Sequence, residues 1–262
     1  MMTDALVSCA ERIRAAYSQG PVPPLRDVLE PADIDDAYAV QALNTAFWQD
    51  QGRRIVGRKV GLTAKAVQAQ LGVDRPDFGV LFDDMAIADG GRLSPDRIIQ
   101  PKAEAEVAFI LGADLADPEA TAEEVASAVA HAVAAIEIVD SRIADWKITF
   151  ADTVADNGSS AFFVLGETRK PLEGLDLWTC GMVLEVTGEI VSLGAGAACL
   201  GHPLNALAWL AKTLAERGEP LRAGDIVLSG ALGPMVAIKP GDVVKATIGG
   251  LGSVGFTYGE PS

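Results

Sequence analysis

The sequence predicts an α+β protein, in which a helical N-terminal region (residues 1–55) precedes a β-rich region (residues 56–262). The chain has 262 residues, 49% of them hydrophobic, which is enough for a folded globular core. Clear helical spacing of apolar residues dominates the first 55 residues, whereas short β-branched runs broken by glycines dominate the rest. We therefore expect the β-rich region to carry the function.

The N-terminal region contains one clear helix signal, from Ile34 to Gln51. Its apolar positions recur at helical spacing and are Ala37, Tyr38, Val40, Leu43, Ala46 and Phe47. Asp33 is the expected N-cap and Gly52 the expected end of this helix. The preceding segment 20–24, Gly-Pro-Val-Pro-Pro, predicts a stiff, extended connector.

Short apolar runs predict strands along the rest of the chain. They cover residues 55–60, 97–111, 135–139, 161–165, 181–186, 225–229, 235–238, 243–248 and 253–258. Two helices interrupt them: the capping box Thr121–Glu124 opens a helix to about Ala132, and Pro203 opens a second that ends near Gly218. The sequence Lys-Pro-Gly-Asp at 239–242 predicts a type II turn.

Charge and cysteine usage limit the class of partner. A net charge of −15 argues against nucleic acid and against an anionic membrane surface, because both would repel the protein. Cys9, Cys180 and Cys199 lie far apart, so neither a disulfide framework nor a thiolate metal site is indicated. The acidic residues Asp4 and Glu11 near the N-terminus are not expected in a signal peptide. No apolar run reaches the length of about 18 residues that a membrane-spanning helix needs. We expect a cytoplasmic protein with a small-molecule partner.

Three glutamates form the strongest functional signal. Glu104 and Glu106 occupy alternate positions of a predicted strand, so both point to one face about 7 Å apart. Glu137 lies inside another apolar run, where an unpaired carboxylate is costly to bury. The alternative is that Glu104 and Glu106 lie on the exposed face of an antiparallel sheet. The aliphatic neighbours of Glu137 make an exposed face harder to form there and favour a metal site. Oxygen ligands without histidine indicate Mg²⁺ or Mn²⁺.

Two further candidates are a lysine and an aspartate. Lys59 lies in a predicted strand flanked by glycines, where desolvation would lower its pKa and make it usable as a base. A lysine that extends to solvent is the alternative. Asp77 lies in the predicted turn 74–79 and could face a ligand or cap its own backbone. The small-residue loops 154–160 and 194–201 could approach a ligand carboxylate closely.

Other motifs do not support a different chemistry. The segment 250–255 matches G-x-G-x-x-G but is followed by only seven residues, so it predicts a turn rather than a dinucleotide site. His131, expected within a helix, and His202, at a helix start, accompany no serine or cysteine hydrolase signature. Both histidines are therefore interpreted as structural, although His202 lies beside a glycine-rich loop.

Six segments together resemble one protein family. They are Gly-Arg-Lys-Val-Gly-Leu-Thr (57–63), Gln-Leu-Gly-Val-Asp-Arg-Pro-Asp-Phe-Gly (70–79), Gln-Pro-Lys-Ala-Glu-Ala-Glu (100–106), Asp-Thr-Val-Ala-Asp-Asn (152–157), Leu-Gly-His-Pro-Leu-Asn-Ala (200–206) and Gly-Ala-Leu-Gly-Pro-Met-Val-Ala (230–237). In this order they resemble the hydratase/decarboxylase branch of the fumarylacetoacetate hydrolase superfamily, and within it the 2-hydroxypenta-2,4-dienoate hydratases. The resemblance runs from about residue 35 to the C-terminus and implies a mixed β-roll with an N-terminal helical part. Gly158 departs from the alanine usual in that family.

The resemblance also implies site residues, position by position. It assigns Mg²⁺ or Mn²⁺ to Glu104, Glu106 and Glu137, acid/base catalysis to Lys59 and Asp77, and substrate binding to Leu62, Ser160, Gly194 and Gly196. It implies hydration of a small 2-hydroxy-dienoate to a 2-oxo acid, in meta-cleavage degradation of aromatic compounds. It further implies a homo-oligomer that associates with other enzymes of that pathway.

Two alternatives to the hydratase stay open. The first is a 2-oxo-hexenedioate (4-oxalocrotonate) decarboxylase of the same branch, which needs the same metal and the same enolate. Segments 80–85 and 230–237 look more like the hydratases. The second is a non-catalytic assembly partner, which the presence of both Lys59 and Asp77 disfavours because assembly needs neither.

Overall fold

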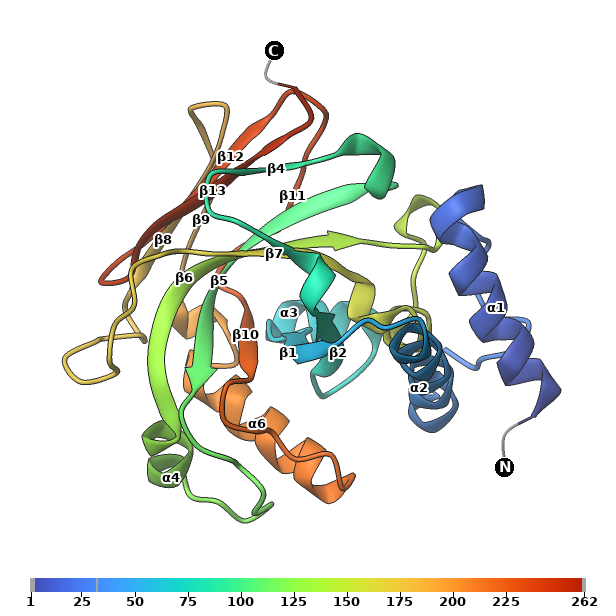
Figure 1. Ribbon diagram of the computed structural model, residues 1–262, viewed down its shortest axis with the longest axis horizontal. Coiled ribbons are helices and arrows are strands. Elements are labelled where there is room, and N and C mark those ends of the chain that lie inside the picture. The colour runs from blue at the N-terminus through green and yellow to red at the C-terminus, as the bar shows by residue number, and fades with distance from the viewer. Residues whose placement is uncertain (1–2, 32, 261–262) are drawn as a thin grey trace.

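Two curled, mixed β-sheets form the body of the protein in the computed structural model, which describes residues 3–31 and 33–260 (Figure 1). The eight-stranded sheet has the order β2-β1-β10-β5-β6-β7-β3, with β11 paired to β5. Its strands are β1 (Ile55–Gly61), β2 (Asp77–Phe82), β3 (Ala86–Ile87), β5 (Pro101–Leu111), β6 (Val129–Asp140), β7 (Ser160–Leu165), β10 (Ile226–Ala231) and β11 (Val236–Ala237). The five-stranded sheet has the order β4-β13-β12-β8-β9, with β4 (Gly91–Leu93), β8 (Gly181–Val186), β9 (Glu189–Ala195), β12 (Val243–Ile248) and β13 (Gly252–Tyr258). The predicted α+β fold with a curled mixed sheet is confirmed.

Six α-helices surround the sheets: α1 (Asp4–Gln19), α2 (Ile34–Asp50), α3 (Lys65–Leu71), α4 (Ala122–Ser127), α5 (Phe150–Ala155) and α6 (Pro203–Glu216). Figure 1 shows α1 and α2 on one side of the molecule, whereas α4 and α6 lie at another end of the long strands. The predicted N-cap of α2 is confirmed, because the Asp33 carboxylate accepts a hydrogen bond from the Asp36 N–H at 3.1 Å. None of the helices in the described ranges combines the length and apolarity that a membrane span requires.

Helix α2 is tied to the elements that carry the site. The Gln41 side chain donates hydrogen bonds to the carbonyls of Phe78 in β2 (3.0 Å) and Val154 in α5 (2.8 Å). The Tyr38 ring stacks on Phe78 with 4.5 Å between centroids. Residue 55, the predicted boundary, is the first residue of β1, and the division into two domains there stays a prediction.

Two element boundaries differ from the prediction. The helix that opens at Thr121 ends at Ser127, and residues 129–132 begin β6 instead, so His131 lies in a strand. The alanine-rich sequence there favours a helix locally, but pairing with β5, which sets His131 opposite Ile110, overrides that preference. The strand predicted from residue 97 begins only at Pro101, since a 3₁₀ turn covers Pro95–Arg97.

A small hydrophobic cluster lines the inner face of the eight-stranded sheet. Its members are Val80, Leu81, Phe82, Met85, Ala108, Val133, Ala135, Phe163 and Leu228. Side chains alternate along a strand, so Glu104 and Glu106 share the face of Ala108, and Glu137 shares that of Ala135. The three glutamates therefore project from the apolar inner face of this sheet rather than from an exposed surface.

Candidate active site

The register of β5 against β6 brings the three glutamates together. Glu104 lies opposite Glu137 in the antiparallel pair, and Glu106 follows two residues along β5. One carboxylate oxygen from each glutamate lies within 4.8 Å of the others. Glu106 and Glu137 are fully buried, whereas Glu104 stays partly exposed and forms the solvent side of the cluster. The predicted grouping of these residues is thus what the strand pairing produces.

Several oxygens of this cluster are left without a hydrogen-bond donor. Glu106 Oε2 accepts from the Gly230 N–H at 2.7 Å, but among the described residues no hydrogen-bond donor reaches its buried Oε1 or either buried Glu137 oxygen. The nearest cation is Lys59, whose Nζ lies 3.3 Å from Glu137 Oε2. One ammonium does not balance three carboxylates, and buried unpaired charges are expensive. The donor set fits a hard divalent cation such as Mg²⁺ or Mn²⁺.

Crowding of buried carboxylates changes their protonation in the metal-free protein. Burial, together with the charge of Glu137, raises the pKa of Glu104 to about 7. Burial, with the neighbouring carboxylates, also raises the pKa of Glu106 well above its ordinary value. Burial raises the pKa of Glu137 as well, although Lys59 acts in the opposite direction. The metal-free cluster therefore holds protons near neutral pH, which a cation must displace.

We expect magnesium binding to release protons and to strengthen as the pH rises from 6 to 8. Folded carboxyls with raised pKa values keep protons that the unfolded chain loses, so the metal-free fold loses stability over this range. Magnesium at 100 times its dissociation constant then adds about 2.7 kcal/mol to the free energy of unfolding. Isothermal titration calorimetry, repeated at several pH values in buffers of different ionisation enthalpy, measures the magnesium affinity and the number of protons released. An affinity that does not change with pH would contradict the cluster as the site of binding.

Lys59 and Asp77 meet beside the cluster across the β1–β2 pair. Asp77 is the first residue of β2, not part of the turn in which the sequence placed it, and lies opposite Gly61. A Cβ on Gly61 would lie 2.1 Å from Asp77 Oδ1 and 3.2 Å from Lys59 Nζ. Glycine at 61 therefore leaves the space in which the buried ammonium and carboxylate approach each other.

The predicted direction of the Lys59 pKa is wrong for the metal-free protein. Burial does act to lower the pKa of Lys59, as expected, but the carboxylates of Glu137 and Asp77 outweigh it and raise the pKa above its ordinary value. Burial raises the pKa of Asp77, although Lys59 acts in the opposite direction. Lys59 is therefore held as an ammonium that can donate a proton.

The segment Asn157–Ser159, here called the left-handed segment, packs against Lys59 and Asp77. Its three residues have φ values of 57°, 59° and 55°. A Cβ at Gly158 would lie 3.4 Å from Lys59 Cδ and 3.5 Å from Asp77 Oδ1, so an alanine would fit by contact distance. Ser160, which follows the segment, is buried, and its hydroxyl has no hydrogen-bond partner among the described residues.

The remaining predicted substrate-binding residues lie in different surroundings. A Cβ on Gly194 would lie 1.9 Å from the Leu232 carbonyl oxygen, and one on Gly196 would lie 1.7 Å from that of Leu177. Close backbone packing thus explains both glycines, and their substrate role stays a prediction. Leu62 directly follows β1 with a φ of 56°, and its carbonyl accepts from Gln68 Nε2 at 2.8 Å.

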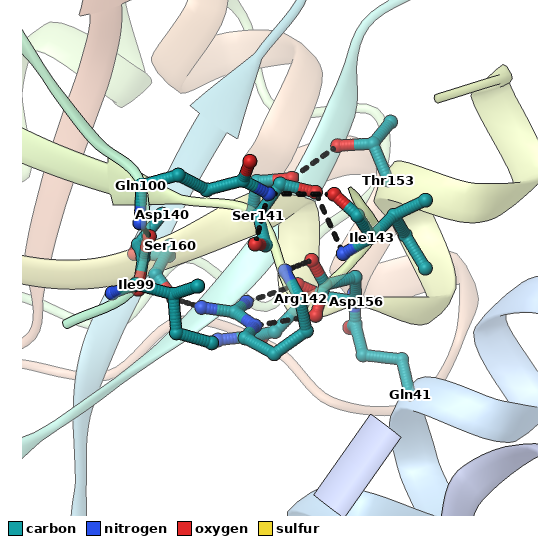
Figure 2. A network of polar contacts seen from close by, with 12 residues as sticks. Gln41, Ile99, Gln100, Asp140, Ser141, Arg142, Ile143, Thr153, Asp156 and Ser160 are labelled. Atoms are coloured by element: carbon teal, nitrogen blue, oxygen red, sulfur yellow. Dashed lines mark hydrogen bonds and ion pairs between the residues drawn. The ribbon is translucent and has the colours of Figure 1, made fainter. Parts of the chain in front are cut away.

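The sequence reasoning missed a buried ion pair behind the left-handed segment. Arg142 and Asp156, both almost fully buried, hydrogen-bond through Arg142 Nε and Asp156 Oδ1 at 2.5 Å (Figure 2). A signal was available, since an arginine within Ile-Val-Asp-Ser-Arg-Ile is unusual in an apolar run. Its partner, 14 residues further along the chain, could not be identified without the fold.

Comparison with known proteins gives three findings. A family model described as fumarylacetoacetate (FAA) hydrolase C-terminal matches residues 54–257. Two curated relatives are 56% identical to this chain: a 2-keto-4-pentenoate hydratase of Paraburkholderia xenovorans, over 92% of this chain and 90% of the relative, and 2-keto-4-pentenoate hydratase 1 of Dechloromonas aromatica, over 96% of both. The solved structure of 4-oxalocrotonate decarboxylase from Pseudomonas putida G7, complexed with magnesium and adipate, is 37% identical. It superposes with a TM-score of 0.92, covering 98% of this chain and 99% of that one.

Proposed function

The chain belongs to the fumarylacetoacetate hydrolase family, and from this premise we propose that it is a divalent-metal-dependent hydratase, a hydro-lyase. The reaction is the conversion of 2-hydroxypenta-2,4-dienoate to 4-hydroxy-2-oxopentanoate in the meta-cleavage degradation of aromatic compounds. The observation that carries the proposal is the three-glutamate cluster beside Lys59 and Asp77, in a chain similar throughout to curated hydratases. A homo-oligomer, and association with other enzymes of the pathway, stay predictions.

The proposed roles of the site follow from its geometry. Mg²⁺ or Mn²⁺ held by Glu104, Glu106 and Glu137 would supply a Lewis acid that stabilises negative charge on the substrate's C2 oxygen. The Ser160 hydroxyl, near the Glu137 carboxylate, is placed to orient the substrate's carboxylate end. Burial of Lys59 and Asp77 keeps bulk water away from the proton transfers.

Lys59 and Asp77 can move every proton of the reaction between them. Asp77 takes the proton of the C2 hydroxyl while the Lys59 ammonium donates one to C5, which gives the 2-oxo-3-enoate. Water then adds at C4, which is electrophilic through conjugation to the C2 carbonyl. Lys59, now neutral, accepts the proton of that water, and Asp77 returns its proton to C3. Both residues end in their starting state, so turnover needs no organic cofactor.

A decarboxylase is the second candidate, because the 4-oxalocrotonate decarboxylase structure is so similar. Both reactions use a metal-stabilised enolate, but the decarboxylase substrate carries a second carboxylate. Three other cations lie in the segments assigned to the site, and one of them, the exposed Arg75, pairs with Asp74 at 2.9 Å. Arg58 points elsewhere, since its guanidinium hydrogen-bonds the Gly57 carbonyl at 3.1 Å and lies 3.5 Å from Glu219. Lys102 shares the face of Glu104, and its Nζ lies 4.0 Å from the Trp146 ring centroid. Arg58 and Arg75 are therefore held away from the cluster, and only Lys102 remains for a second carboxylate, which favours a monoacid.

We expect the five-carbon monoacid to be hydrated with a higher kcat/KM than the six-carbon diacid. The assay uses freshly generated 2-hydroxypenta-2,4-dienoate and 2-oxohex-3-enedioate, each with and without magnesium, and follows 4-hydroxy-2-oxopentanoate and CO₂. Release of CO₂ from the diacid at the higher kcat/KM would replace the hydratase by the decarboxylase. Failure to turn over either acid with magnesium present would favour the non-catalytic assembly partner.

A further inference from the structure

The left-handed segment is energetically unfavourable and lies at the catalytic pair. Asn157 and Ser159 carry side chains in the left-handed conformation, which is unfavourable for residues other than glycine. Such strain persists only where the surroundings hold it. On one side, Gly158 of this segment packs against Lys59 and Asp77. Other contacts hold the segment from its opposite side.

Arg142 binds both ends of the left-handed segment (Figure 2). Its Nη2 donates to the carbonyl of Asp156, the residue before the segment, at 2.6 Å, and its Nη1 donates to the carbonyl of Ser160, the residue after it, at 3.1 Å. Its Nε and backbone N–H donate to the two carboxylate oxygens of Asp156, at 2.5 and 2.9 Å. The planar guanidinium reaches all these acceptors at once, which a lysine ammonium on a flexible stem does not.

The side chains of Asn157 and Ser159 make further contacts that hold the segment. The Asn157 amide bridges Val80 of β2, accepting from its N–H at 2.7 Å and donating to its carbonyl at 2.9 Å. The hydroxyls of Ser159 and Thr153 lie 3.1 Å apart. These contacts attach the segment to β2 and α5, but Arg142 is the side chain that spans its two ends.

Stability alone is a weak reason for this ion pair. Replacing a buried ion pair by well-packed apolar residues is often neutral or stabilising, because desolvation offsets the Coulomb attraction. Arg142 is 1% exposed, and within the described residues its side chain hydrogen-bonds Asp156 and Ser160 rather than the three glutamates, Lys59 or Asp77. Its effect on the site must pass through the segment that it holds.

We propose that Arg142 is a positioning residue, which with Asp156 fixes the left-handed segment so that Gly158 stays packed against Lys59 and Asp77 and the chain enters β7 at the buried Ser160. The catalytic part of this inference rests on the proposed function, whereas the structural part rests on the contacts alone. The metal ligands lie on β5 and β6, outside the segment, so magnesium binding does not depend on Arg142.

Arg142→Lys tests the inference because it keeps the charge and removes the guanidinium fork. We expect kcat to fall about 10- to 100-fold, as small misplacements of catalytic groups do, with magnesium affinity within about twofold of wild type. Hydrogen exchange at residues 156–160 should rise, while β12 keeps its protection. Arg222→Lys is the matched control, since it removes a guanidinium in the loop before β10 that also hydrogen-bonds an aspartate, Asp114 at 2.8 Å. It should change neither kcat nor exchange at 156–160.

The outcomes separate this inference from the proposed function. If Arg142→Lys keeps wild-type kcat, or loses it without faster exchange at 156–160, the positioning role is wrong. If the wild type is inactive on the dienoate but the variant still exchanges faster there, only the proposed function fails. Should Arg142→Lys not fold, Asp156→Asn takes its place, because its amide nitrogen cannot accept one of the two Arg142 bonds. A smaller loss of kcat with faster exchange supports the role, and no change in either overturns it.

Discussion

Replacing Lys59 by methionine is expected to lower kcat by about 10²- to 10⁴-fold, the usual contribution of a positioned acid or base. Methionine keeps most of the buried volume but has no proton to exchange with the substrate. The Lys59 Nζ lies 3.3 Å from Glu137 Oε2, so its removal takes one positive charge away from the cluster. Magnesium should therefore bind at least as tightly to the variant as to the wild type. A fall in kcat with retained metal affinity separates proton transfer from metal binding.

Measurement requires turnover at saturating magnesium and an independent magnesium titration for both proteins. Lys245→Met is the matched control, because Lys245 is exposed on β12 and pairs only loosely with Glu185, at 3.8 Å. Its kcat should equal that of the wild type. Near wild-type turnover in Lys59→Met would remove Lys59 from the mechanism and leave Asp77 as the one proposed proton carrier.

Local signals in the sequence were enough to predict some turns and helix starts. The type II turn at 239–242 is confirmed, since Gly241 has a φ of 99° and the Asp242 N–H bonds the Lys239 carbonyl at 3.1 Å. The capping box of Thr121 and Glu124 is confirmed too, and so is the helix that begins at Pro203. These signals depend on neighbours within four residues, so the fold does not alter them.

Features set by distant contacts could not be predicted. Residues 129–132 are alanine-rich and helix-favouring, but β5 is paired along them, and only the tertiary structure supplies that strand. The Gly230 N–H that binds Glu106 is 124 residues away in the chain. The direction of the Lys59 pKa depends on how many carboxylates β2, β5 and β6 bring to it, which its own glycine-flanked segment does not reveal.

The glutamate pattern, by contrast, was informative because its geometry is local. Side chains two residues apart in a strand point to the same face, so Glu104 and Glu106 share a face whichever strand pairs with theirs. Glu137 could be recognised as a third member only by the cost of burying it among aliphatic residues. Their assembly into one cluster is seen in the structure, whereas their role as metal ligands stays a prediction.

Glu106→Gln is expected to weaken magnesium binding by more than about 100-fold, since even outer-shell substitutions at metal sites cost 10- to 100-fold. Glu106 Oε2 already accepts the Gly230 N–H, so the glutamine would turn its carbonyl oxygen to Gly230 and its NH₂ group to the cluster. An NH₂ group repels a cation. Turnover at a fixed magnesium concentration below saturation should fall at least as far as metal binding does.

The same substitution should leave the metal-free fold as stable as the wild type, or more stable. Burial and like charges raise the pKa of Glu106, so a neutral side chain there removes repulsion from Glu137 and Glu104. The melting temperature at pH 8 without metal should therefore hold or rise, while the increase on adding magnesium should disappear. Glu189→Gln, at an exposed position that begins β9, is the matched control and should keep the full increase. A magnesium-induced increase in Glu106→Gln as large as that of the wild type would place the cation elsewhere.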